Sequence, residues 1–203
     1  NHRGEACLSG TFPLNSSGAM PPTKFSISKD SPAYYLTSVT KDRLPIFRTE
    51  AVAQLVCNAI DEARLSANFL LFAYVIMPDH VHLVTDSSRE SRDIHRFANG
   101  IISRRLIDYL KENNFNESLV KLRIAERSNG WKHSVWQHHP DTRLLWSEQM
   151  LRQRIQYTHL NPVRAELADH PNDWKWSSAR IFHGKRLEDE PLEVDLDRVQ
   201  WRR

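Results

Sequence analysis

The chain has 203 residues, of which 40% are hydrophobic and 26% are charged, the balance of an ordinary soluble globular domain. Its longest uninterrupted apolar run, residues 69–77, is about half as long as a membrane-spanning helix, which excludes an integral membrane protein. Lysine and arginine exceed aspartate and glutamate by 28 − 25 = 3 charges. This mildly basic balance permits nucleic acid as a partner but does not require it.

Cysteine and glycine usage excludes further classes of protein. The two cysteines, Cys7 and Cys57, lie far apart, so we expect neither a disulfide framework nor a cysteine-rich zinc site. A reducing compartment, the cytoplasm, fits this usage best. The sequence contains neither GxGxxG nor GxxxxGK, and it therefore lacks the common loops with which nucleotide-binding enzymes hold phosphates.

The first 23 residues differ from the rest of the chain. They contain three of the six glycines and three prolines, and they show little periodicity. They have no basic region followed by an apolar run, so they do not read as a secretory signal. We expect residues 1–23 to be a disordered N-terminal extension, or a remnant of cloning, outside the fold.

Strand and helix patterns follow in the next part of the chain. Residues 34–40 are rich in aromatic and β-branched side chains, which predicts a strand. Apolar residues at spacings of three and four then predict a helix over about 52–63, with Thr49 as its N-cap. Residues 69–77 predict a strand buried on both faces, and a turn at Pro78-Asp79 leads into a second strand over 80–85.

The second half of the chain has a less regular pattern of predicted elements. We predict a helix over 93–112, a polar loop over 113–129, and short extended pieces over 131–145. A third long helix begins at the N-cap Ser147 and runs to about residue 161, where Pro162 ends or kinks it.

This order of elements predicts an α+β fold, an antiparallel sheet with packed helices of the ferredoxin-like kind. We place the domain over residues 24–178. Residues 179–203 form a tail for which the sequence suggests no role.

Two histidines alternate in the strand over 80–85. Since alternate side chains of a strand share a face, His80 and His82 point one way while Val81 and Leu83 point into the core. Two neighbouring imidazoles form half of a divalent metal site. The chain has ten histidines, however, so an HxH pair can arise by chance, and on spacing alone the chance pair is favoured.

A polar stripe follows on the third long helix. Tyr157 and Asn161 stand one helical turn apart, and Arg154 and Arg164 extend the same stripe in both directions. The alternative is a partly solvated helix with a tyrosine at its edge, which the spacing alone favours.

Basic and aromatic residues alternate in several places, a pattern suited to phosphates and unpaired bases. For each tryptophan, packing in the core is the alternative. The residues that we single out as candidate DNA contacts are Arg104, Arg105, Arg154, Arg164, Trp174 and Trp176.

Together these segments are far more specific than any one of them. YVIMPDHVHLV (74–84), VWQ (135–137), YTHLNPVRAEL (157–167) and WKWSS (174–178) resemble the single-tyrosine HUH transposases, above all the REP-associated tyrosine transposases of bacteria. The resemblance covers about residues 34–178. Glu166 departs from it, because members of the family usually carry glycine there, and so does His139-Pro140-Asp141.

The resemblance implies a role for each polar residue. His80 and His82 match the pair that holds Mg²⁺ or Mn²⁺, Asn161 matches a third metal ligand, and Tyr157 matches the nucleophile. The implied partner is single-stranded or hairpin DNA of repetitive palindromic elements, cleaved through a 5′-phosphotyrosine and rejoined. The family resemblance leaves a monomer or a homodimer open.

Two further hypotheses compete with a DNA strand transferase. One is a domesticated DNA-binding protein that recognises repeat hairpins without transposing, which the intact His80, His82 and Tyr157 disfavour. The other is a structural zinc module, which the absence of cysteine ligands disfavours.

Overall fold

The computed structural model describes residues 24–124 and 133–201. The prediction for residues 1–23 lies outside this range. In chain order the elements are β1 (Ala33–Val39), η1 (Lys41–Arg43), α1 (Glu50–Ala67), β2 (Leu71–Met77), β3 (His80–Thr85), α2 (Ser91–Glu112), α3 (Asn116–Lys121), β4 (Asp141–Leu145), α4 (Glu148–Arg164), η2 (Pro171–Asp173), α5 (Ala179–Phe182) and η3 (Leu196–Arg198).

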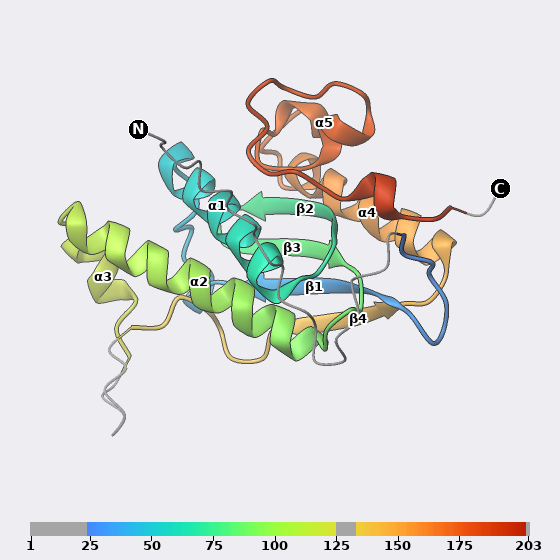
Figure 1. Cartoon of the computed structure of the whole chain (residues 1–203). Helices are drawn as coiled ribbons and strands as arrows, with labels where there is room; N and C mark the ends of the chain where they lie inside the picture. Colours follow the sequence, from blue (N-terminus) through green and yellow to red (C-terminus); the bar gives the residue numbers. More distant parts are fainter. Residues whose placement is uncertain (1–23, 125–132, 202–203) are drawn as a thin grey trace, which may run out of the picture.

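The four strands form one antiparallel sheet in the order β2-β3-β1-β4 (Figure 1). The units β1-α1-β2 and β3-α2-β4 each leave a gap between their two strands, and one strand of the other unit fills that gap. This interleaving is the split βαβ arrangement of ferredoxin-like folds. The predicted α+β fold with an antiparallel sheet is therefore confirmed.

Helices cover both faces of the sheet. Helices α1 and α2 run side by side on one face, while α4 lies on the other (Figure 1). On the α4 face, Leu151 and Ile155 belong to one buried cluster with Tyr35 and Val84. Every residue of β2 is buried, as expected of a strand that is covered on both sides.

Helices α1 and α4 begin where the sequence predicts. The hydroxyl of Thr49 accepts from the backbone N–H of Val52, and that of Ser147 accepts from Met150. Helix α4 continues through Pro162 to Arg164, so of the two effects predicted for Pro162, an end or a kink, the end is wrong.

The continuation has a local cause. In the last turn, Pro162 removes only the N–H that would reach the carbonyl of Thr158. The side-chain amide of Asn161 lies 3.3 Å from that carbonyl and donates to it instead.

The segment predicted as a loop over 113–129 contains the short helix α3. Leu122, at the end of α3, is fully buried, and Leu119 packs against the same core. A short polar segment thus becomes helical because two leucines dock on the core, a long-range effect that local composition does not reveal. Residues 125–132, with Trp131 among them, lie outside the described part of the chain.

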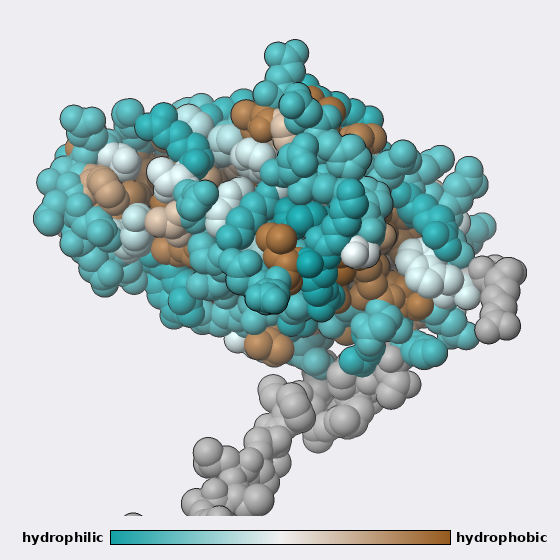
Figure 2. Space-filling view, turned by 90° about the horizontal axis from the view of Figure 1, so that it is seen from above, coloured by the Kyte–Doolittle hydropathy of each residue, from teal (hydrophilic) through white to brown (hydrophobic). Residues whose placement is uncertain are grey.

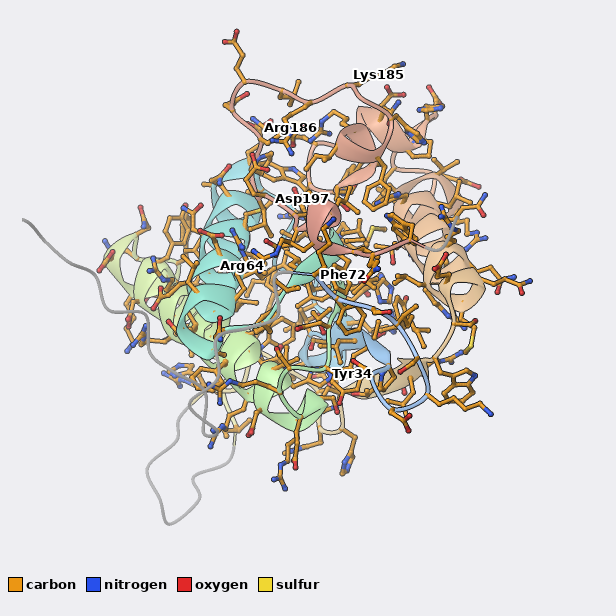
Figure 3. The ribbon with its side chains drawn as sticks, turned by 45° about the vertical axis from the view of Figure 1, so that its right-hand side comes forward. Tyr34, Arg64, Phe72, Lys185, Arg186 and Asp197 are labelled. Atoms are coloured by element: carbon orange, nitrogen blue, oxygen red, sulfur yellow. The ribbon has the colours of Figure 1, made fainter. Side chains whose placement is uncertain are left out.

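The C-terminal segment belongs to the same core. Residues 174–178 run along the free edge of β2, where Ile76 N–H donates to Trp176 O at 2.8 Å and Ser178 N–H donates to Tyr74 O at 3.1 Å. Beyond them, a buried ion pair joins Arg180 to Glu190 at 3.0 Å. Figure 3 shows η3, which carries Asp197, between α1 and α4. The described residues after 178 therefore extend the domain.

The surface seen from above is dominated by hydrophilic side chains, with small and separate hydrophobic groups (Figure 2). Among the described residues, no helix is long and apolar enough to cross a membrane.

Candidate active site on the α4 face

Strand β3 holds both predicted histidines on the face of the sheet that α4 covers. His82 stands opposite Thr37 of β1, and His80 stands opposite Val39. The two imidazole rings meet edge-on, with their centroids 4.8 Å apart. The alternation predicted from the sequence, with Val81 and Leu83 in the opposite core, is confirmed.

His80 is oriented by the residue that precedes it. Nδ1 of His80 lies 2.6 Å from Oδ1 of Asp79, and because a carboxylate only accepts, Nδ1 carries the proton and donates. Partial burial raises the pKa of Asp79, but hydrogen bonds from His80 and Arg43 outweigh it and hold that pKa below its usual value. The lone pair of His80 that can bind another group is therefore on Nε2.

His82 is more deeply placed, with only 6% of its surface exposed. Its Nδ1 lies 2.9 Å from the phenol oxygen of Tyr35 and 3.0 Å from Oγ1 of Thr37. Burial, together with the nearby His80 and Arg154, lowers the pKa of His82 to about 3. The ring is therefore neutral at physiological pH, which is the state in which imidazole binds metals.

Tyr157 reaches the same surface from α4. Its ring lies 6.2 Å from the ring of His82 and 6.1 Å from that of Tyr35, edge-on to both. The residue remains 37% exposed, so part of it is open to a substrate. Because β3 and α4 are separated by some 70 positions in the chain, only the fold brings Tyr157 to the histidines.

Two arginines flank the ring of Tyr157. The guanidinium carbon of Arg164 lies 4.7 Å from the ring centroid and that of Arg154 lies 5.4 Å from it. Arg154 also lies 5.2 Å from the ring centroid of Tyr35. The helical stripe predicted from spacing therefore forms one surface with the histidines, and this surface carries positive charge beside an accessible hydroxyl.

Asn161 lies one turn beyond Tyr157 on this stripe. Its Nδ2 donates to the backbone carbonyl of Tyr157 at 2.9 Å, which holds the amide against the helix. The amide oxygen remains the group that can serve as a ligand.

The other candidate DNA contacts lie elsewhere. Arg104 and Arg105 sit on α2 and pair with Glu62 of α1, in the helix layer on the opposite face of the sheet. The indole N–H of Trp174 donates to Ile76 O at 2.9 Å, and Trp176 packs against the core. For Trp176, the structure shows the packing that the sequence left as the alternative, whereas the indole of Trp174 is held by its hydrogen bond to the edge of β2.

Several residues of this surface were not predicted from the sequence. Tyr35 and Thr37 touch His82, and Asp79 touches His80. Arg143 stands opposite Tyr35 in the sheet register and so shares its face. For Asp79, its position directly before the HxH pair was an available signal. For Tyr35, Thr37 and Arg143, the alternation in β1 and β4 predicts the face of the sheet on which each side chain lies. It does not predict which side chain each one contacts.

Comparison with known proteins identifies the class. Residues 28–139 match the family model of IS200-like transposases, and since this is more than half of the chain, the protein belongs to that family. The matched range includes His80 and His82 and ends before Tyr157.

Two relatives connect the chain to one branch of transposases. A Haemophilus influenzae protein assigned as a REP-associated tyrosine transposase is 25% identical over 152 residues, which cover 74% of this chain and 79% of that protein. The solved structure of a REP-associated tyrosine transposase bound to a REP hairpin aligns with a TM-score of 0.54 and 16% identity. The alignment covers 81% of this chain and 87% of that one, and it shows a shared fold. The resemblance predicted from the motifs is thereby confirmed.

Proposed function

We propose that this transposase cleaves and rejoins single-stranded or hairpin DNA in the cytoplasm, with Tyr157 as its nucleophile. The observation that carries the proposal is the placement of the exposed Tyr157 ring 6.2 Å from the ring of His82, between the guanidinium groups of Arg154 and Arg164. The hairpin as partner is supported by the solved relative, which is bound to a REP hairpin.

The residues of the chain account for binding and attack. Arg154 and Arg164 attract a backbone phosphate to the exposed side of Tyr157. The hydroxyl oxygen of Tyr157 loses its proton and forms a bond to phosphorus, while the bond from phosphorus to the 3′ oxygen breaks. The 3′ oxygen takes up a proton and leaves as a free 3′-OH, and the 5′ end stays linked to Tyr157. A later attack by a 3′-OH on this phosphotyrosine reverses the step and rejoins the strand without ATP.

Three side chains of the site would hold a divalent cation. His80 and His82 each leave Nε2 available as a ligand, because Nδ1 is engaged in both rings, and Asn161, one helical turn beyond Tyr157, would add an amide oxygen. No cluster of three His, Cys, Asp or Glu side chains occurs among residues 24–124 and 133–201, so the closed four-ligand site of a structural zinc module finds no support there. Bound Mg²⁺ or Mn²⁺ would polarise the scissile phosphate and stabilise the charge that develops on it.

A covalent-adduct assay tests this function. A labelled DNA hairpin with single-stranded flanks is incubated with the protein and Mn²⁺ and then run on a denaturing gel. We expect a protein–DNA adduct that a chelator abolishes. Tyr157→Phe should bind the hairpin but form no adduct, whereas Tyr34→Phe and Tyr109→Phe should react.

Each alternative outcome has a distinct meaning. An adduct with Tyr157→Phe would show that another residue is the nucleophile. Hairpin binding without any adduct in the unmodified protein would favour the domesticated DNA-binding protein. Full cleavage by His80→Ala or His82→Ala would show that these histidines do not hold a metal that cleavage needs.

A further inference from the structure

Asp79, in the turn between β2 and β3, contacts His80 of β3 and two residues of the turn that follows β1, Thr40 and Arg43. Its Oδ1 accepts from Nδ1 of His80 at 2.6 Å, and its Oδ2 accepts from Nη1 of Arg43 at 2.9 Å. Its backbone carbonyl lies 2.9 Å from both the N–H and the hydroxyl of Thr40, the residue that follows β1. Both the backbone and the side chain of Asp79 are therefore fixed.

The turn that carries Arg43 has an unfavourable backbone. Asp42 and Arg43 have φ angles of 53° and 52°, in the left-handed region that glycine tolerates and other residues avoid. Such a backbone conformation is strained for residues other than glycine. Lys41, which precedes them, anchors the turn, since its N–H donates to Val135 O at 2.8 Å and its Nζ donates to Lys121 O at 2.9 Å.

The ion pair itself does not explain this arrangement. The side chain of Arg43 is 65% exposed, and an exposed ion pair adds little stability. What the contact does achieve is to hold the carboxylate of Asp79 from the side opposite His80.

We infer that Asp79 and Arg43 are positioning residues for His80: Asp79 keeps the proton on Nδ1 and thereby leaves Nε2 free for a metal, and Arg43 holds Asp79 in place. The inference rests on the proposed function, because it assigns His80 a metal. Without an acceptor at Nδ1, a neutral imidazole populates both tautomers and its ring turns more freely. Loss of such a partner typically weakens metal binding about 10- to 100-fold.

The first test needs no metal. Long-range ¹H–¹⁵N NMR of the metal-free protein at neutral pH reports the tautomer of His80. We expect the Nδ1–H form in the unmodified protein, a mixture of tautomers in Asp79→Ala, and substantial recovery in Asp79→Asn, which retains an oxygen acceptor. A purely structural role of Asp79 would lower the melting temperature and leave the tautomer unchanged.

The second test measures Mn²⁺ affinity by electron paramagnetic resonance. Asp79→Ala should bind Mn²⁺ about 10- to 100-fold more weakly, and Arg43→Ala should show a smaller loss that Arg43→Lys partly restores. Arg96→Ala is the matched control, because Arg96 forms an exposed pair with Asp93 on α2, on the other face of the sheet.

The two tests separate the inference from the function on which it rests. If Asp79→Ala keeps both the tautomer and the Mn²⁺ affinity of the unmodified protein, the inference is wrong while the metal site stands. If His80→Ala binds Mn²⁺ as well as the unmodified protein, the metal site is wrong, and the tautomer of His80 still decides whether Asp79 orients the ring.

Discussion

The phenol oxygen of Tyr35 lies 2.9 Å from Nδ1 of His82, and the ring of Tyr35 meets that of Tyr157 edge-on at 6.1 Å. One side chain of β1 thus touches both the candidate metal ligand and the candidate nucleophile. Tyr35 is 3% exposed and has little room to move. The relative position of the strand that carries His82 and the helix that carries Tyr157 is therefore set in part by Tyr35.

Removing the hydroxyls that contact His82 should weaken metal binding. Thr37 also lies within 3.0 Å of Nδ1, so Tyr35→Phe alone leaves one partner, and Tyr35→Phe with Thr37→Val leaves none. We expect the double variant to bind Mn²⁺ about 10- to 100-fold more weakly than the unmodified protein, and the single variant to fall in between. Electron paramagnetic resonance measures both affinities.

Tyr34→Phe provides the control for this prediction, because Tyr34 alternates with Tyr35 and faces the α1 and α2 layer. An unchanged affinity in the double variant would show that these hydroxyls do not position His82. Because Tyr35 contacts both His82 and Tyr157, Tyr35→Phe is not an inert control in a cleavage assay.

Local patterns were sufficient to predict much of the fold. The alternation in HVHLVT gives β3 with the bounds that the structure shows, His80–Thr85, because one face of that strand is apolar. The N-caps Thr49 and Ser147 fix the starts of α1 and α4, since each hydroxyl satisfies a backbone N–H within the same turn. The polar stripe around Tyr157 follows from helical spacing alone.

The assembly of the site could not be predicted in this way. The sequence makes Arg154 and Arg105 equal candidates for DNA contact, yet α4 and α2 pack on opposite faces of the sheet. Arg105 is paired with Glu62, which is 43 residues distant in the chain. Contacts of this kind depend on how elements pack, and neither periodicity nor composition encodes the partner.

Glu166 should be a destabilising residue at the end of α4. Its φ angle is 55°, and the N–H of Leu167 donates to Pro162 O at 2.9 Å, which is the Schellman arrangement that glycine favours. Glu166→Gly should raise the free energy of unfolding by about 1 kcal/mol, measured by urea denaturation. Glu166→Ala keeps the Cβ atom and should give no comparable gain. A gain of equal size with alanine would assign the effect to the lost charge instead.

We predict a second stabilising substitution at Tyr74. The side chain is fully buried, and within the described residues its hydroxyl has no hydrogen-bond partner. Tyr74→Phe removes an unpaired polar atom and should raise the free energy of unfolding by about 1 kcal/mol. Tyr35→Phe, which removes a paired hydroxyl, should change stability in the opposite direction. If both variants lose stability equally, the hydroxyl of Tyr74 is satisfied in solution.

The last prediction concerns the surface that DNA contacts. Arg154 and Arg164 flank the exposed ring of Tyr157, whereas Arg104 and Arg105 pair with Glu62 on the other face of the sheet. Each arginine that neutralises a phosphate releases counterions, so the logarithm of affinity falls with the logarithm of salt concentration. Arg154→Gln and Arg164→Gln should each reduce that slope by about 1.

Arg104→Gln and Arg105→Gln are the matched controls, since they remove the same charge from the same protein at a distance from Tyr157. Fluorescence anisotropy of a labelled hairpin over a series of salt concentrations gives the four slopes. We expect the two controls to keep the slope of the unmodified protein, contrary to the interpretation from sequence alone. If instead the controls flatten the slope and the α4 variants do not, DNA lies on the α1 and α2 layer, and Tyr157 is not beside it.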